Sequence, residues 1–389
     1  MNNTKNPAVI IPCYKRIKTL ERLLCSLLNA EYPENVPIVF SVDYSGENDV
    51  VDYIKNFDWP YGKKEIILHD KNIGLRKNIL SCGALSRKFG SVIILEDDLY
   101  VSKQFYTYAI KTKEFYAKDR NVAGISLYAY EYSEIGSEKF YPLYNAQDTF
   151  LMQWASSWGQ LWTYRQWQSF YEWYQKNKTE DLNIFNIPDN VINWPESSWK
   201  KYFIAYLVAT EKFFIYPYIS FVSNCGDIGV HCGENSFIQT QVPIPLNYNV
   251  LNMQYADSTL LVKYDSFFQI YPEHLKNSDE IQHIDFDVDL AGTKRRCNIT
   301  RRYLLSSKKC RNPLFKFDKF NIPFALNIIN DSKGDYFSIG KTDDFFYNEN
   351  FLSKVFRCHV NREIVWSGRR SFDVVVYKLL KKMFSYFHR

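Results

Sequence analysis

The chain has 389 residues, of which 46% are hydrophobic, so it is long enough for one large globular domain with additions or for two domains. Its formal net charge of +5 is spread through the chain except at its end, which argues against a nucleic-acid partner. Aromatic residues make up 17% of the chain, and such rings are useful both in cores and against the faces of sugars.

Cysteine usage and the amino terminus indicate the compartment. The eight cysteines include no CxxC pair and several lie in apolar segments, so we interpret them as reduced, buried thiols. Residues 1–7 lack the apolar stretch of a signal peptide, and no run of about 18 apolar residues predicts a membrane span. We therefore expect a cytoplasmic protein.

The first hundred residues alternate between strand and helix patterns. Short apolar runs predict strands, and the segments between them have helical spacing, most clearly the leucines from Leu20 to Leu28. The alternation predicts an α/β fold with a parallel sheet and right-handed crossovers. The predicted strands are 8–12, 37–43, 65–69 and 92–95, and the predicted helices are 20–28, 49–56 and 76–88.

The fourth predicted strand ends in three consecutive carboxylates, Glu96, Asp97 and Asp98. Ligands bind at the carboxyl ends of parallel strands, and three acids placed there repel one another. A divalent cation would relieve this repulsion, and hard oxygen ligands suit Mg²⁺ or Mn²⁺ while leaving sites for phosphate oxygens. The alternative interpretation is an acidic cap on a helix that starts near Ser102.

Polar residues also follow the first two predicted strands. Taken singly, Lys15 and Arg16 are typical of the exposed first turn of a helix, and Asp43 is typical of a turn cap. Together at successive strand ends, they indicate a nucleotide held by a base contact, a basic group near its phosphates and a metal. The chain contains no GxGxxG motif after its first strand and no GxxxxGK[ST] motif, so we expect neither a dinucleotide site nor a P-loop.

The pattern changes after residue 150. Residues 150–232 predict tryptophan-rich helices, whose rings are typical of a core although some could stack on a pyranose, and a glycine-rich loop follows at 224–233. Beyond about residue 245 the alternation of strand and helix is lost. The acids at 285, 287 and 289 alternate with apolar residues, which predicts a strand with a polar face rather than a calcium loop.

The last segment, Phe372 to Arg389, has apolar residues on one helical face and basic residues on the opposite face. A basic amphipathic helix suits the anionic inner leaflet of a membrane. The alternative is a helix docked on its own domain. We expect peripheral association with the inner face of the cytoplasmic membrane.

Eight ordered sequence blocks carry a family resemblance, namely 7–16, 41–43, 72–76, 95–99, 156–162, 198–202, 216–220 and 229–231. They resemble nucleotide-sugar glycosyltransferases of the GT-A fold. More particularly, they are similar to bacterial polysaccharide transferases distantly related to the N-acetylglucosaminyltransferase that initiates complex N-glycans. The resemblance implies a Rossmann-like, mostly parallel sheet flanked by helices. We expect a catalytic domain over 1–245, with a nucleotide-sugar half (1–125) and an acceptor half (126–245), an α+β extension over 246–370 and the basic helix over 371–389.

The resemblance also implies roles for single residues. Asp98 matches the direct ligand of Mn²⁺ or Mg²⁺, and Glu96 and Asp97 match contacts to the ribose and the sugar of the donor. Asp43 matches the acid that binds a pyrimidine base, which points to a UDP-sugar. The other nucleotide-binding candidates are Pro12, Tyr14, Arg16, Gly74, Arg76, Lys77 and His231.

The catalytic base is where the chain departs from the family pattern. Relatives place paired acids just after the tryptophan that corresponds to Trp199, whereas this chain has Lys200 and Lys201. Glu196 is therefore the first candidate for deprotonating the acceptor, and Asp227 in the glycine-rich loop is the second. Each acid could instead be a surface or capping residue.

The resemblance implies a metal-dependent, inverting glycosyltransferase. It would move a hexosyl or N-acetylhexosaminyl group from a UDP-sugar to a hydroxyl of a glycan or lipid-linked oligosaccharide, in capsule or lipopolysaccharide synthesis. The missing acidic pair motivates an alternative, a non-catalytic nucleotide-sugar-binding subunit of a polysaccharide assembly complex. A sugar nucleotidyltransferase would need a glycine-rich phosphate loop after the first strand, and the chain has none there.

Overall fold

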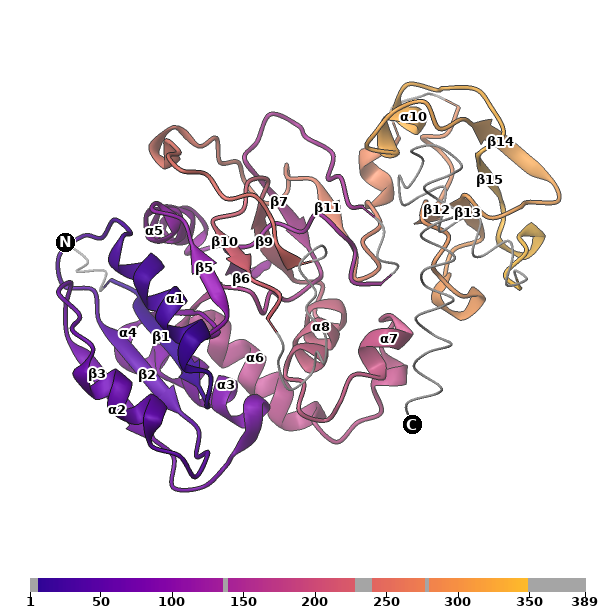
Figure 1. Ribbon diagram of the computed structural model, residues 1–389. Coiled ribbons are helices and arrows are strands. Elements are labelled where there is room, and N and C mark those ends of the chain that lie inside the picture. Colours follow the sequence, from indigo (N-terminus) through magenta and orange to yellow (C-terminus); the bar gives the residue numbers. More distant parts are fainter. Residues whose placement is uncertain (1–5, 136–138, 228–239, 277–279, 349–389) are drawn as a thin grey trace, which may run out of the picture.

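The structure, a computed structural model, describes residues 6–135, 139–227, 240–276 and 280–348 (Figure 1). Every strand and helix predicted for the first hundred residues is present, and the helix predicted over 76–88 is divided in two at Leu85. In chain order these elements are β1 (Ala8–Cys13), α1 (Ile17–Leu28), β2 (Ile38–Val42), α2 (Asp49–Asn56), β3 (Lys64–Leu68), α3 (Gly74–Ala84), α4 (Ser86–Phe89) and β4 (Ser91–Ile94).

The middle of the chain mixes short strands with helices. In order these are β5 (Leu99–Val101), α5 (Phe105–Tyr116), β6 (Val122–Ser126), β7 (Thr149–Met152), β8 (Gln160–Thr163), α6 (Tyr164–Asn177), α7 (Asp189–Ile192), α8 (Lys200–Ala209), β9 (Phe213–Pro217) and β10 (Val222–Asn224). The prediction of tryptophan-rich helices is right for α6, which contains Trp167 and Trp173, but it is wrong for the other tryptophans of the segment. Trp162 lies in β8, and four lie outside helices and strands, namely Trp154, Trp158, Trp194 and Trp199. The core role holds, because the Trp162 ring stacks on Phe203 at 5.4 Å and both are buried.

The C-terminal part is built around a separate four-stranded sheet in the order β12-β13-β15-β14. Its elements are β12 (Phe286–Asp289), β13 (Tyr303–Ser306), β14 (Pro313–Phe317), α10 (Ala325–Ile329) and β15 (Phe337–Lys341). The strand predicted at 285–290 is thus confirmed as β12. One earlier strand, β11 (Lys263–Tyr264), pairs with β7 in the large sheet, and Figure 1 shows the small sheet lying beyond that edge.

A nine-stranded sheet forms the centre of the molecule, in the order β11-β7-β9-β6-β8-β4-β1-β2-β3. Strands β4, β1, β2 and β3 are parallel neighbours, whereas β8 runs antiparallel to both β4 and β6. The expected α/β fold, with a large, mostly parallel sheet flanked by helices and a C-terminal extension, is therefore confirmed. The carboxyl ends of β1, β2 and β4 meet at one edge of this sheet.

Alternate residues of the central strands face two cores. In β1, Ala8 and Ile10 face the core covered by α3, α6 and α8, whereas Val9 and Ile11 face the core covered by α1, α2 and α5. Strands buried on both faces have continuous apolar runs instead of alternating ones. This double burial of β1, β2 and β4 explains why these strands could be predicted from the sequence.

The expected burial of the cysteines agrees with the structure only in part. Cys13 and Cys82 are buried, but Cys25 and Cys297 are exposed, so the prediction of buried thiols is wrong for the latter two. Within the described ranges, no helix is both long enough and apolar enough to cross a bilayer. The predicted basic helix at 372–389 and the candidate His231 lie outside the described residues.

Candidate active site

The acid turn, Glu96 to Asp98, connects β4 to β5 at the carboxyl end of β4. The next helix, α5, begins only at Phe105, so the alternative of a helix cap does not hold. Burial, with repulsion from Asp98 and Asp97, raises the pKa of Glu96 to about 8. Burial also raises the pKa of Asp97 to about 6, although Arg16 opposes that rise. The turn thus holds more carboxylates than the neighbouring basic side chain can neutralise.

Arg16 supplies part of the missing positive charge. It lies in the turn between β1 and α1, where its guanidinium pairs with Asp97 and its Nη1 lies 3.2 Å from Oδ2 of Asp98. Although burial alone would lower it, Asp97 and Asp98 raise the pKa of Arg16 above its usual value. A guanidinium fixed in this way is suited to hydrogen-bond phosphate oxygens next to the acids.

The acid turn suits a cation that is shared with a substrate. Within the described part of the chain, no group of three or more His, Cys, Asp or Glu side chains is arranged to hold a metal. Asp98 is partly open and is oriented by Asn224, whose Nδ2 lies 3.4 Å from its Oδ1. Mg²⁺ and similar ions are commonly held by one or two carboxylates together with phosphate oxygens and water. The residues present therefore fit a divalent ion that completes its coordination with a diphosphate.

Asp43 joins the end of β2 to the start of α3. The backbone N–H groups of Tyr44 and Ile73 donate to its Oδ1 at 2.9 and 2.8 Å, and that of Gly74 donates to Oδ2 at 2.9 Å. Gly74 has a φ of +77°, which a residue with a side chain would adopt at a cost. A carboxylate has about four acceptor positions, so Oδ2 keeps room for one donor from a ligand.

The remaining nucleotide-binding candidates that the structure describes lie around the same edge. Pro12 is buried near the end of β1, and Tyr14 follows in the turn that contains Arg16. Lys77 is exposed on α3, one residue after Arg76. Arg76 lies over the ring of Tyr202 at 5.2 Å, so it connects α3 to α8.

Glu196, the first candidate base, lies at this α3–α8 contact. Its Oε1 is 2.6 Å from Lys201 Nζ, and its Oε2 is 3.4 Å from Nη1 of Arg76. The Glu196 side chain is 76% exposed. The hydrogen bond from Lys201 lowers the pKa of Glu196, against a small opposing effect of burial. The carboxylate is therefore ionised and accessible, but its basicity is reduced.

Asp227, the second candidate base, is held by a residue that the sequence did not single out. The two terminal nitrogens of the Arg22 guanidinium, on α1, donate hydrogen bonds to the two oxygens of Asp227. Asp227 follows Asn224, which contacts Asp98, so the carboxylate lies beside the acid turn. A bidentate pair occupies lone pairs that a general base would need.

Lys200 is buried in a cage of aromatic rings. Its Nζ lies 2.6 Å from Oε1 of Glu134. Burial lowers the pKa of Lys200, and both Glu134 and Glu96 oppose that change. The centroids of the surrounding rings lie between 5.0 and 5.7 Å from Nζ, and they belong to Trp154, Trp194, Tyr130 and Trp158.

Both lysines that replace the expected acids thus hold a glutamate from elsewhere in the chain. Lys200 holds Glu134 and Lys201 holds Glu196. Glu134, Lys200, Arg22 and Asn224 were missed by sequence reasoning. The sole sequence signal for the glutamates is the unusual pair of adjacent lysines in an apolar helix, which requires two acidic partners.

A comparison of the sequence with models of protein families gives a match that includes the acid turn. Residues 8–192 match the model of the family described as glycosyl transferase family 2. This glycosyl transferase family 2 match, just under half of the chain, contains Asp43 and the acid turn but ends before Glu196 and Asp227. The expected resemblance to glycosyltransferases is confirmed at this level. The finer likeness to bacterial polysaccharide transferases stays a prediction.

Comparisons with solved structures gave distant, partial likenesses. A mannosyltransferase from Pyrobaculum calidifontis in complex with GDP-Man and Mn²⁺ is 17% identical over 32% of this chain and 36% of that one, with a TM-score of 0.26. GalNAc-T7 with UDP, GalNAc and Mn²⁺ is 15% identical over 56% and 43%, with a TM-score of 0.37. S. aureus TarS 1–349 with UDP-GlcNAc is 13% identical over 55% and 57%, with a TM-score of 0.33. The chain spans less than two thirds of each of these proteins, and no curated protein matches it significantly.

Proposed function

We propose that the protein transfers a sugar from a UDP-sugar to a hydroxyl of a glycan or lipid-linked glycan, with a divalent cation. The observation that carries the proposal is the acid turn at the end of β4, paired with Arg16 at the end of β1. This edge combines a cation site with a fixed guanidinium, which are the two features that a nucleoside diphosphate requires. The match to glycosyl transferase family 2 over residues 8–192 supports the same class of reaction.

Donor binding would use three groups along the sheet edge. Asp98 would hold Mn²⁺ or Mg²⁺, and Arg16 would contact the diphosphate. Asp43 would accept the N–H of the uracil ring through its Oδ2, which makes one hydrogen bond with backbone. The metal, when bound, would neutralise charge that develops on the departing diphosphate.

The transfer step would be inverting. The acceptor hydroxyl oxygen forms a bond to the anomeric carbon while the bond from that carbon to the UDP oxygen breaks. The hydroxyl proton passes to Glu196, and UDP leaves with the bonding electrons. Both acids are hydrogen-bonded to basic side chains, and Glu196 is favoured over Asp227 because its side chain is 76% exposed, against 27% for Asp227.

Lys200 and Lys201 keep a second candidate open. A nucleotide-sugar-binding subunit without catalytic activity would need the donor edge, by which we mean Arg16, Asp43 and the acid turn, and would not need a base. UDP release from a panel of UDP-sugars with Mn²⁺ separates the two, with Asp98→Ala as the inactive variant. The matched control is Asp335→Ala, because the Asp335 side chain is 83% exposed and belongs to the C-terminal part.

An enzyme releases UDP faster from at least one donor in the parent and in Asp335→Ala than in Asp98→Ala. Removal of a group that stabilises developing charge typically lowers turnover by about a hundredfold or more. Equal release by the parent and Asp98→Ala from every donor would contradict the enzyme and favour the binding subunit. Glu196→Gln and Asp227→Asn then identify the base, since loss of a general base costs roughly a hundredfold or more.

The proposed acceptor lies at the inner face of the cytoplasmic membrane, as in capsule or lipopolysaccharide synthesis. The sequence feature that supports this location is the basic amphipathic pattern of residues 372–389. Sedimentation with anionic vesicles tests it. A chain that lacks residues 372–389 should stay in the supernatant and still bind UDP, and unchanged sedimentation would contradict the location.

A further inference from the structure

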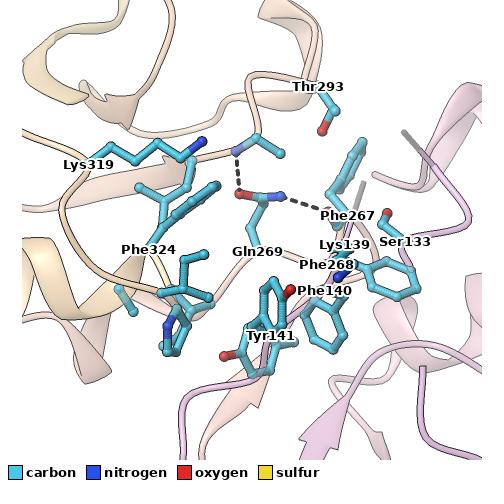
Figure 2. A pocket seen from close by; sticks show the side chains of 17 residues that line it. Ser133, Lys139, Phe140, Tyr141, Phe267, Phe268, Gln269, Thr293, Lys319 and Phe324 are labelled. Atoms are coloured by element: carbon cyan, nitrogen blue, oxygen red, sulfur yellow. Dashed lines mark hydrogen bonds between the residues drawn. The ribbon is translucent and has the colours of Figure 1, made fainter. Parts of the chain in front are cut away.

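A pocket lies between the large sheet and the C-terminal part, which we call the junction pocket. One wall comes from Ser133 and from residues in 139–141 and 264–270, and the other from residues in 290–293 and 319–325. The pocket is partly open to solvent. Figure 2 shows Gln269 between the rings of Phe267, Phe140 and Tyr141 on one side and Lys319 and Phe324 on the other.

The two walls are tied together by buried polar contacts. Asp265 accepts the N–H groups of Phe267 and Gln269 through Oδ1 and pairs through Oδ2 with Lys294 of the opposite wall at 2.6 Å. The Gln269 side chain accepts the N–H of Ala291 at 3.3 Å. These contacts cross the junction, so the pocket keeps its shape without a ligand.

The backbone of this turn is strained. Phe268 has a φ of +59°, a conformation that costs a bulky residue on the order of 1 kcal/mol or more and persists only where the surroundings enforce it. Its ring packs edge-on against Trp154 at 4.9 Å and contacts Tyr130 at 5.7 Å. Both of these rings enclose Lys200. Phe268 therefore connects the junction pocket to the aromatic cage of Lys200.

The lining combines ring faces with polar groups. Tyr141 is 39% exposed and Phe324 is half-buried. The ammonium groups of Lys139 and Lys319 lie over these rings, 5.7 and 4.7 Å from their centroids, so one face of each ring is already occupied. The hydroxyl of Thr293 is buried and has no hydrogen-bond partner in the described structure. A pyranose satisfies both features, because its C–H face stacks on aromatic rings and its hydroxyls pair with polar groups. A lipid chain would leave the Thr293 hydroxyl unpaired.

We propose that the junction pocket binds a pyranose ring of the acceptor glycan, beyond the sugar that receives the transferred group. The inference rests on the proposed function, since it assigns the acceptor and not the donor to this pocket. Ser133 lines the pocket and is adjacent to Glu134, which pairs with Lys200, so the pocket lies close to the lysine that neighbours the acid turn. The C-terminal part would thereby select the acceptor.

The test uses the fluorescently labelled full chain on a microarray of bacterial and mammalian glycans. The variant is Tyr141→Ala with Thr293→Val, and the matched control is Tyr144→Ala, because Tyr144 is 60% exposed in the same loop and does not line the pocket. Binding of UDP with Mn²⁺ is measured in parallel for all three proteins as a test of the donor site and of folding.

We expect the parent and Tyr144→Ala to bind a common set of glycans, and the double variant to bind them at least about tenfold more weakly while still binding UDP. Glycan binding that persists in the double variant would overturn the inference. A parent that binds UDP but no glycan would also overturn it and would leave the proposed function standing. A parent that does not bind UDP with Mn²⁺ would overturn both.

Discussion

The donor edge and the lysine pair are two charged regions of one site, and they are built in opposite ways. At the donor edge, Asp43 and the acid turn follow strands directly, and neighbouring strand ends bring them together. At the lysine pair, Lys200 and Lys201 begin α8 and take their partners from outside the helix, Glu134 from 66 residues away and Glu196 from five. The first region follows from local chain order, and the second depends on tertiary packing.

The difference shows how a site can keep its donor half while its acceptor half changes. Under the proposed function, the acids of the donor edge would bind the diphosphate and its cation. Where the family resemblance led us to expect paired acids, the chain has two lysines, and each lysine pairs with one glutamate. Each lysine therefore has a carboxylate beside it that comes from outside α8.

The largest effect on stability is expected for Lys200, because the side chain of its partner Glu134 is only 22% exposed. Lys200→Met should lower the free energy of unfolding by about 3–5 kcal/mol, because Glu134 would keep a largely buried charge without its cation. Adding Glu134→Gln should restore part of the loss. Urea unfolding followed by tryptophan fluorescence measures it, with Lys333→Met as the control at a 63% exposed side chain. A loss below about 1 kcal/mol would mean that the cage does not depend on this pair.

A smaller effect is expected at the donor edge. Asp43→Asn replaces one carboxylate oxygen with an N–H₂ group, which cannot accept a hydrogen bond. The remaining oxygen cannot accept the N–H groups of Tyr44, Ile73 and Gly74 all together, so at least one of them loses its acceptor. Such a loss costs about 1–3 kcal/mol of stability and should also weaken UDP binding. Asp335→Asn is the matched control. Unchanged UDP affinity would mean that Asp43 does not bind the uracil ring.

The smallest effect on stability is expected for Lys201, because its partner Glu196 is 76% exposed and would stay solvated without the lysine. Here pH dependence is the better measurement. A base works when ionised, so activity should fall as pH falls through the pKa of Glu196, which Lys201 holds below its usual range. Lys201→Met should raise that pKa and move the acid limb of the kcat profile to higher pH. Stability should change by no more than about 1 kcal/mol. An acid limb that does not move would exclude Glu196 as the base.

The sequence predicted the parts of the molecule that depend on short-range pattern. Strands β1, β2 and β4 are buried on both faces, so their apolar runs stand out, and the acid turn follows directly from the end of β4. The contact between Arg22 and Asp227 joins residues 205 positions apart, and no periodicity predicts it. Trp162 was assigned to a helix because an aromatic-rich segment of a core strand resembles a buried helix, and the antiparallel β8 came from tertiary pairing with β4 and β6.

The central claim is that Asp98 and a divalent cation together bind the diphosphate of the donor. Isothermal titration calorimetry of UDP into the parent tests it directly, with Mn²⁺, with a chelator, and with Asp98→Asn in the presence of Mn²⁺. The account predicts binding to the parent with Mn²⁺ that is at least about tenfold weaker in chelator and in Asp98→Asn. Equal affinity for UDP in all three experiments would contradict it.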